Sequence, residues 1–177
     1  MRQYWVAPVP PFQDADGTAL ASSTALTDVS PLPANIIAAN QLEKYTALEV
    51  EAFGEFSNTG TPTLLIGVYF GGVAGVALAA CAATATAAGV TGVPWKLTYR
   101  GRVRAIGSAG SIVGQGVLEL GTSLTALTPI PIPATKAART VAIDTTTAKA
   151  VTIGAQWGTS NAANTLTVNE ILVKLIN

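Results

Sequence analysis

The fold class is decided by Val93-Pro-Trp-Lys-Leu-Thr-Tyr-Arg-Gly-Arg-Val-Arg-Ala-Ile106, a stretch in which apolar and polar residues alternate. Side chains two residues apart lie on the same face of a β-strand, so this alternation predicts a strand with one buried face. The apolar and small residues share one face: Trp95, Leu97, Tyr99, Gly101, Val103 and Ala105. The polar residues share the other face: Lys96, Thr98, Arg100, Arg102 and Arg104. We therefore predict a long strand with basic side chains in a row on its outer face.

Turn residues follow this strand and lead into a second one. The stretch Gly107-Ser-Ala-Gly110 predicts a tight turn, so residues 93–106 and 111–120 are expected to pair as a hairpin. The segments between other turn signals predict further strands at residues 18–29, 46–56, 62–70, 76–86, 150–157 and 165–176.

About eight short strands without a long helical period predict an all-β fold. In a chain of 177 residues, that number of strands is typical of a two-sheet antiparallel β-sandwich, most commonly one with a jelly-roll-like arrangement. An immunoglobulin-like sandwich is the alternative. It usually needs fewer residues, and the chain lacks the characteristic Cys…Trp…Cys spacing.

Residues 1–17 differ from the rest of the chain, because they hold prolines and aromatic residues and show no strand alternation. We expect residues 1–17 to form an extended N-terminal arm and residues 18–177 to form the sandwich domain. Tyr4 and Trp5 lie close to Pro8 in this arm, and they are candidate anchors in the groove of a neighbouring subunit. On this interpretation, a chain without the arm still folds but binds its partner less tightly.

The chain has no histidine and a single cysteine, Cys81. Histidine is the usual general acid or base near neutral pH, so Ser/His and Cys/His nucleophile arrangements are excluded. One thiol without an imidazole also rules out a His/Cys zinc site. The stretch Asp14-Ala-Asp-Gly17 is read as a turn, because it lacks the ligand spacing of a calcium-binding loop. No motif indicates lysine or paired-carboxylate catalysis, and we expect a non-enzymatic protein without a metal or a cofactor.

Residues 64–83 allow a membrane-spanning alternative, because they are almost wholly apolar and free of charge. Three features favour buried strands instead. The run holds several glycines, it continues into the alternating Thr84-Ala-Thr-Ala87, and turn residues flank it on both sides. We therefore expect two strands joined at Gly71-Gly72, and no membrane partner.

The overall composition indicates a surface that is covered by partners. Hydrophobic residues make up 49% of the chain and charged residues only 11%. Charged residues average about a quarter of an ordinary soluble domain, so few charges remain here to cover a free surface. The net charge is zero, with 10 basic and 10 acidic residues, which gives no basis for broad nucleic-acid affinity. We expect a protein that assembles with other protein subunits.

Four cations share the outer face of the deciding strand, and we call them the basic row: Lys96, Arg100, Arg102 and Arg104. The basic row is either a solvated strand face or a contact with an acidic partner, which would relieve the mutual repulsion of the cations. Phosphate binding is a third interpretation, but so short a patch on a neutral chain binds phosphate weakly. Glu49 and Glu51 lie on the outer face of residues 46–56, and they are candidates for the acidic side of such a contact on another copy.

The last expected strand is apolar on both faces. One face carries Ile171, Val173 and Leu175. The other face carries Leu166, Val168, Leu172 and Ile176. Such a strand is either central to its sheet or covered by another subunit, so Ile171, Val173 and Leu175 are candidate interface residues.

Two stretches of the chain carry a family resemblance. The first is Arg104-Ala-Ile-Gly-Ser-Ala-Gly-Ser-Ile-Val-Gly-Gln-Gly-Val117, in the predicted hairpin. The second is Asp144-Thr-Thr-Thr-Ala-Lys-Ala-Val-Thr-Ile-Gly-Ala-Gln-Trp-Gly-Thr-Ser-Asn-Ala-Ala-Asn-Thr-Leu-Thr-Val168, which combines an Asp-Thr-Thr turn, a strand ending in Trp and a Ser-Asn-Ala-Ala-Asn loop. Both resemble small jelly-roll virion structural proteins of tailed bacteriophages. The similarity extends from about Thr18 to the C-terminus.

The resemblance implies a structural component of the phage particle, of the head decoration or minor tail type. The implied location is the virion, on the outer surface of the head, and the implied partner is the major capsid protein. The low charge, the apolar last strand and the tendency of jelly rolls to pack around a three-fold axis favour a homo-oligomer, in particular a trimer. The alternative is a minor tail or tail-fibre component that binds a receptor or a glycan.

Overall fold

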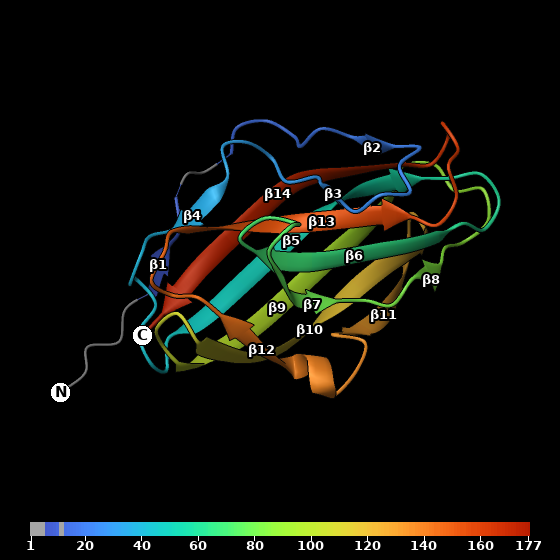
Figure 1. Ribbon diagram of the computed structural model, residues 1–177. Coiled ribbons are helices and arrows are strands. Elements are labelled where there is room, and N and C mark those ends of the chain that lie inside the picture. The colour runs from blue at the N-terminus through green and yellow to red at the C-terminus, as the bar shows by residue number, and fades with distance from the viewer. Residues whose placement is uncertain (1–5, 11–12) are drawn as a thin grey trace.

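The computed structural model describes residues 6–10 and 13–177, and it shows two antiparallel β-sheets packed face to face (Figure 1). The prediction of an all-β, two-sheet antiparallel sandwich is therefore confirmed. The described residues form 14 strands, more than the eight or so expected. Several of the additional strands have only two or three residues, which is too few to show an alternation in the sequence.

The larger sheet has eight strands, and the smaller sheet has six. The larger sheet consists of β1 (Val6–Pro8), β2 (Leu20–Ala21), β5 (Ala47–Ser57), β9 (Val93–Ala105), β10 (Gly110–Ser123), β11 (Ala126–Ile132), β12 (Thr140–Ile143) and β14 (Thr165–Ile176). The smaller sheet consists of β3 (Thr27–Asp28), β4 (Asn35–Ile37), β6 (Thr63–Phe70), β7 (Val76–Ala80), β8 (Thr84–Ala85) and β13 (Lys149–Trp157). A single 3-10 turn, η1 (Ala137–Arg139), comes directly before β12 in the described chain.

In both sheets, strands from the end of the chain lie beside strands from its first half. The larger sheet runs β1-β14-β5-β9-β10-β11, with β2 beside β14 and β12 beside β10, and the smaller sheet runs β3-β13-β6-β7, with β4 beside β13 and β8 beside β6. The last two strands therefore return to pair with β5 and β6, the first long strands of the two sheets. The last strand of each sheet therefore lies beside the first long strand of the same sheet.

The deciding strand, β9, lies in the middle of the larger sheet between β5 and β10. The predicted alternation is confirmed, since Trp95, Leu97 and Tyr99 are buried whereas the cations of the basic row are exposed. The predicted hairpin is confirmed as well, because β9 pairs with β10 along nearly its whole length. The basic row therefore lies on the solvent side of the larger sheet.

A β-bulge in β14 explains why this strand reads as apolar on both faces. Its pairing with β5 shifts between Val168 and Glu170, so β14 has one extra residue there. One extra residue moves every following side chain to the opposite face of the strand. The buried side chains are thus Leu166 and Val168 before the bulge and Ile171, Val173 and Leu175 after it. The prediction of an interface at Ile171, Val173 and Leu175 is wrong, because these residues fill the core of their own chain.

The apolar residues 64–83 contain two strands as expected, but the second strand ends at Ala80 and does not continue to residue 86. The strands β6 and β7 pair as an antiparallel hairpin. The turn between them begins with Gly71 and Gly72, whose φ angles of 89° and 75° lie in the region that favours glycine. In the described part of the chain, no helix has both the length and the apolar character that crossing a membrane requires.

The described N-terminal residues belong to the sandwich and do not form a separate arm. The strand β1 pairs with β14 at one edge of the larger sheet. Val9 follows β1 and is only 3% exposed, and its N–H donates to the Val173 carbonyl at 2.8 Å. The Asn35 side-chain amide donates in turn to the Val9 carbonyl at 2.7 Å. The expected boundary between an arm of residues 1–17 and a domain of residues 18–177 is therefore wrong for the described residues.

The sequence alternation does not predict β11, because proline is rare in strands. This strand lies at the edge of the larger sheet beyond β10, and it contains Pro129 and Pro131. Their nitrogens face the same side of the strand because the two prolines are two residues apart, and that side is the free edge since β10 occupies the other. Proline has no N–H to donate, so the edge is closed to the addition of another strand.

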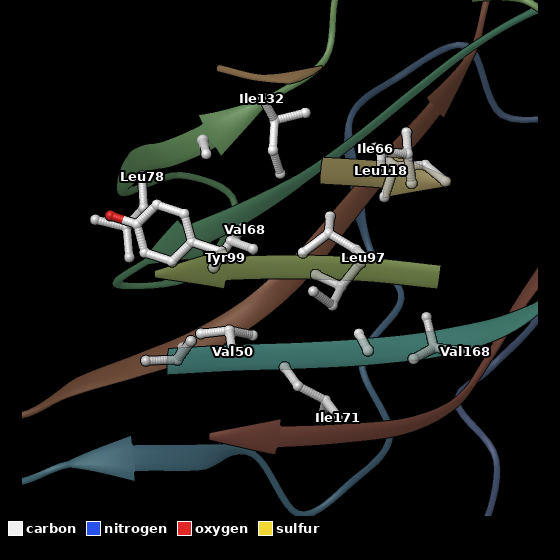
Figure 2. Packing of buried hydrophobic residues seen from close by; sticks show 14 of the residues in the cluster. Val50, Ile66, Val68, Leu78, Leu97, Tyr99, Leu118, Ile132, Val168 and Ile171 are labelled. Atoms are coloured by element: carbon white, nitrogen blue, oxygen red, sulfur yellow. The ribbon is translucent and has the colours of Figure 1, made fainter. Parts of the chain in front are cut away.

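The core lies between the two sheets, and Figure 2 shows side chains from both of them in one cluster. The smaller sheet contributes Ile66, Val68 and Leu78, and the larger sheet contributes Val50, Leu97, Tyr99, Leu118, Val168 and Ile171. The Tyr99 ring lies over Gly101 and Gly114, which are directly opposite each other on β9 and β10. A Cβ atom on Gly114 would lie 2.6 Å from Cζ of Tyr99. The two glycines therefore provide the space that the ring occupies.

Candidate functional site

Acidic and basic side chains alternate across the outer face of the larger sheet. The strand β5 lies between β14 and β9, which places Glu49 opposite both Lys174 and Arg100. Arg100 Nε lies 3.3 Å from Glu49 Oε1, and Lys174 Nζ lies 3.6 Å from Glu51 Oε1. The two glutamates that the sequence indicated as a contact for another copy thus form ion pairs within their own chain.

These ion pairs neutralise only part of the basic row. The Arg100 side chain is 62% exposed and that of Glu49 is 24% exposed, so the pair contributes at most about 1 kcal/mol. Among the described residues, Arg102 and Arg104 have no carboxylate within ion-pair distance, and the same holds for Lys96. Lys96 lies directly opposite Glu119 of β10, so the positive charge that remains uncompensated on the outer face of β9 is that of Arg102 and Arg104.

A cleft of about 350 Å³ lies over the arginines of β9, and we call it the arginine cleft. Its lining residues are Arg100, Gly101, Arg102, Val113, Gly114, Gln115 and Arg139. Arg139 belongs to η1 and reaches the cleft because the next residue, Thr140, pairs with Val113 of β10. The structure thus brings Arg139 together with two members of the basic row, while Arg104 and Lys96 do not line the cleft.

Sequence reasoning missed Arg139, and no signal in the sequence could have found it. The residue stands in a short run of Ala, Thr and Lys without alternation or motif. Its position depends on the pairing of β12 with β10, which joins segments that have no pattern in common. Arg139 therefore becomes a candidate only when the sheet is known.

A second hollow, of about 220 Å³, adjoins the arginine cleft and shares Arg100 and Gln115 with it. Its other lining residues include Glu49, Glu51 and Thr98. The side chains of this polar hollow offer both hydrogen-bond donors and acceptors. The two depressions together make the outer face of the larger sheet the candidate binding surface.

Exposed apolar side chains lie on the hairpin of β10 and β11. Leu124 in the turn is 71% exposed, and Leu127 on β11 is 46% exposed. Val117 is exposed as well and lies opposite Pro131. Val117 and Leu127 lie on the same face of the hairpin, four register positions apart, and exposed apolar side chains can take part in contacts with another protein. We call Val117, Leu124 and Leu127 the apolar hairpin patch.

The remaining interface candidates do not join these surfaces. Tyr4 and Trp5 lie outside the described residues, so their predicted role stays a prediction. Ile171, Val173 and Leu175 are in the core, on the opposite side of the larger sheet from the basic row.

The stretches that resemble phage proteins contain strands and the turns that connect them. Asp144 accepts hydrogen bonds from the N–H and hydroxyl of Thr146 and from the hydroxyl of Thr147. The Thr146 hydroxyl bond in particular lowers the pKa of the Asp144 carboxyl. In the later loop, buried Asn164 accepts from the Thr59 N–H at 3.1 Å and donates to the Thr159 carbonyl at 3.1 Å. The residues that carry the resemblance therefore stabilise connections between strands.

Reactive groups are few and lie apart in the described chain. No group of three or more His, Cys, Asp and Glu residues is placed to hold a metal ion among the described residues. Cys81 is buried, and its burial raises the pKa of the thiol. The thiolate, which is the nucleophilic form, is therefore disfavoured at neutral pH.

Comparisons with protein-family models and with curated proteins found no relative of the chain. No protein-family model matches it, and the search of curated proteins found no significant match. The functional interpretation therefore depends on the geometry of the outer face and on the resemblance in residues 104–117 and 144–168.

Proposed function

We propose that the chain is a non-enzymatic structural protein of a bacteriophage particle, a decoration protein that binds the outer surface of the head as an oligomer and stabilises it. The main support for this proposal is an observation that combines the sequence with the fold. The two stretches that resemble phage virion proteins, residues 104–117 and 144–168, lie in strands and turns of one antiparallel sandwich. A two-sheet antiparallel sandwich is the general fold class to which the resemblance points.

The proposed function requires binding and no chemistry. The long strands β5, β9 and β10 have paired strands on both sides, so the side chains on their outer face stand on a rigid support. The uncompensated cations of β9 favour a negatively charged surface, such as acidic patches of the major capsid protein. When an oligomer makes several weak contacts of this kind at the same time, its overall affinity for the shell is much higher than the affinity of a single contact.

The first test of this proposal is association with the particle. In the phage that encodes the chain, we expect the chain to sediment with intact heads through a density gradient, detected by an antibody. Heads that lack the chain should open at a lower temperature, and purified chain should restore the difference, because binding to the assembled shell stabilises that state. Absence of the chain from purified particles would contradict the proposal.

The oligomeric state is the second expectation, and the apolar hairpin patch supports it. The edge at β11 carries two prolines, so copies that meet at this edge do so through side chains rather than by pairing strands. We expect a trimer in analytical ultracentrifugation at micromolar concentration.

Replacing Leu124 and Leu127 by Ser should weaken assembly by about tenfold or more, since each buried leucine contributes about 1.5–3 kcal/mol. The matched control is Leu32→Ser, which alters an exposed leucine elsewhere. A monomeric wild-type chain would count against the trimer.

The alternative, a minor tail or tail-fibre component, is favoured by the polar hollow. Carboxylate, hydroxyl and amide groups of Glu51, Thr98 and Gln115 converge there and match the hydrogen-bonding groups of a sugar. Binding of purified chain to a glycan array, lost on Gln115→Ala, would support this alternative. Location of the chain on tails rather than heads by antibody labelling would support it as well.

A further inference from the structure

We infer that the arginine cleft binds the carboxylate groups of an acidic segment of a partner protein. The inference deepens the proposed function and rests on it for the identity of that partner as a component of the phage shell. It goes beyond the sequence because Arg139, which lies far from the basic row in the chain, completes the cleft.

The convergence of arginines is the first reason. Arg100 and Arg102 lie on one face of β9, and Arg139 comes to the same cleft from η1. Like charges repel each other, so such a cluster is unfavourable unless an anion neutralises it. Glu49 is the one carboxylate in the described chain that pairs with any of the three, and it pairs with Arg100 alone. Arg102 and Arg139 therefore remain available to an external anion.

The chemistry of the guanidinium group selects the kind of anion. A guanidinium is planar and presents its N–H groups as a fork, which matches the two oxygens of a carboxylate. The Gln115 side chain at the same cleft adds an amide donor. The cleft volume of about 350 Å³ is at the lower end of the range for ligand pockets, about 300–1,000 Å³. It therefore suits one or two acidic side chains of a peptide.

The surroundings of the cleft disfavour a nucleic acid as the ligand. Glu49 and Glu51 line the adjoining polar hollow, where they would repel the phosphates of a continuous polyanion. Nucleic-acid binding needs several cations along the path of the backbone, whereas this chain has a net charge of zero. An acidic peptide can place its carboxylates at the arginines alone.

The test uses the purified full chain and an acetylated hexaglutamate peptide as the probe. We expect the peptide to bind in isothermal titration calorimetry and to shift the side-chain Nε–Hε NMR signals of the cleft arginines. The variant Arg102→Gln/Arg139→Gln should weaken binding by about tenfold or more, the factor that corresponds to the loss of a charge-assisted hydrogen bond. Binding that is equally tight in this variant would overturn the inference.

The matched control is Lys44→Gln/Lys149→Gln, which removes the same charge from positions outside both the cleft and the basic row. Lys44 lies in the turn before β5, and Lys149 is the first residue of β13 in the smaller sheet. Because screened charges act weakly over a distance, we expect the control to change the affinity by less than about twofold. Equal losses in the two double variants would show only a general charge effect and would overturn the cleft assignment.

A third variant predicts a change of the opposite sign. Glu49→Gln removes the internal carboxylate that pairs with Arg100, so the third guanidinium becomes available to the peptide. We therefore expect tighter peptide binding in Glu49→Gln than in the wild type. Weaker binding would overturn the assignment of Arg100 to the site.

Two further measurements separate the inference from its competitors and from the proposed function. An oligothymidine of matched charge should bind more weakly than the peptide, and tighter binding of the oligothymidine would overturn the choice of carboxylate. Peptide binding is measured without particles, so its failure overturns the cleft assignment alone. Failure of the wild-type chain to sediment with phage particles overturns the proposed function alone.

Discussion

Deletion of residues 1–17 should lower the free energy of unfolding by about 3–6 kcal/mol, a large part of the stability of a domain. Burial of the Val9 side chain accounts for about 1.5–3 kcal/mol of this loss. The Asn35 side chain would lose hydrogen bonds to the Val9 carbonyl and to Gln13, at a cost of about 1–3 kcal/mol for a buried amide. Urea denaturation of the full chain and of the shortened chain measures the difference.

A pair of point variants controls for the shortening itself. Val9 is 3% exposed, so Val9→Ala should cost about 1.5 kcal/mol. Val6 on β1 is 61% exposed, so Val6→Ala should change the stability by less than about 0.5 kcal/mol. A shortened chain as stable as the full one would contradict the structure and restore the separate arm that the sequence indicates.

Gly114→Ala should destabilise the sandwich by about 1–3 kcal/mol, the usual cost of an extra methyl group in a filled core. The added methyl group would lie 2.6 Å and 2.7 Å from Cζ and Cε2 of the Tyr99 ring, well inside contact distance. Alanine suits a strand no worse than glycine does, so a loss of stability would come from this clash. Thermal or urea denaturation of the variant measures the loss.

A double-mutant cycle tests whether the Tyr99 ring is the cause. The smaller side chain of Tyr99→Leu should reduce the cost of Gly114→Ala, so the two changes together should cost less than their sum. Gln115→Ala, on the exposed face of the same strand, is the control and should change the stability by less than about 0.5 kcal/mol. Strict additivity of Gly114→Ala and Tyr99→Leu would mean that the ring does not press on position 114.

The hydroxyl group of Tyr99 has a different role in the core from that of the ring. It is buried and has no hydrogen-bond partner among the described residues, and its burial raises the pKa of the phenol. An unpartnered buried hydroxyl costs free energy, so this group fills space beside Gly101 and Gly114 without stabilising the core by a hydrogen bond. The sequence indicates correctly that Tyr99 faces inward, but it contains no sign that Gly101 and Gly114 make room for it.

The candidate site was predictable in part. The outward direction of Arg100 and Arg102 follows from the two-residue period of β9, which is a local property of the chain. The partner of Arg100 does not follow from it. Glu49 is near because β5 happens to be the neighbour of β9, and Arg139 is near because β12 pairs with the far side of β10. Neighbouring strands are chosen by the packing of the whole sandwich, and no short stretch of sequence contains that choice.

The sequence by itself determined the all-β class, the hairpin of β9 and β10 and the inward face of Trp95, because alternation and turn residues act within a few positions. Only the tertiary structure decided the role of β14, where one bulge turns two apolar faces into a single core face. It also decided the place of residues 6–10, which β14 holds at the edge of the larger sheet. The physical reason is the same in both cases: register and edge position depend on hydrogen bonds between segments far apart in the chain, and a local pattern cannot specify them.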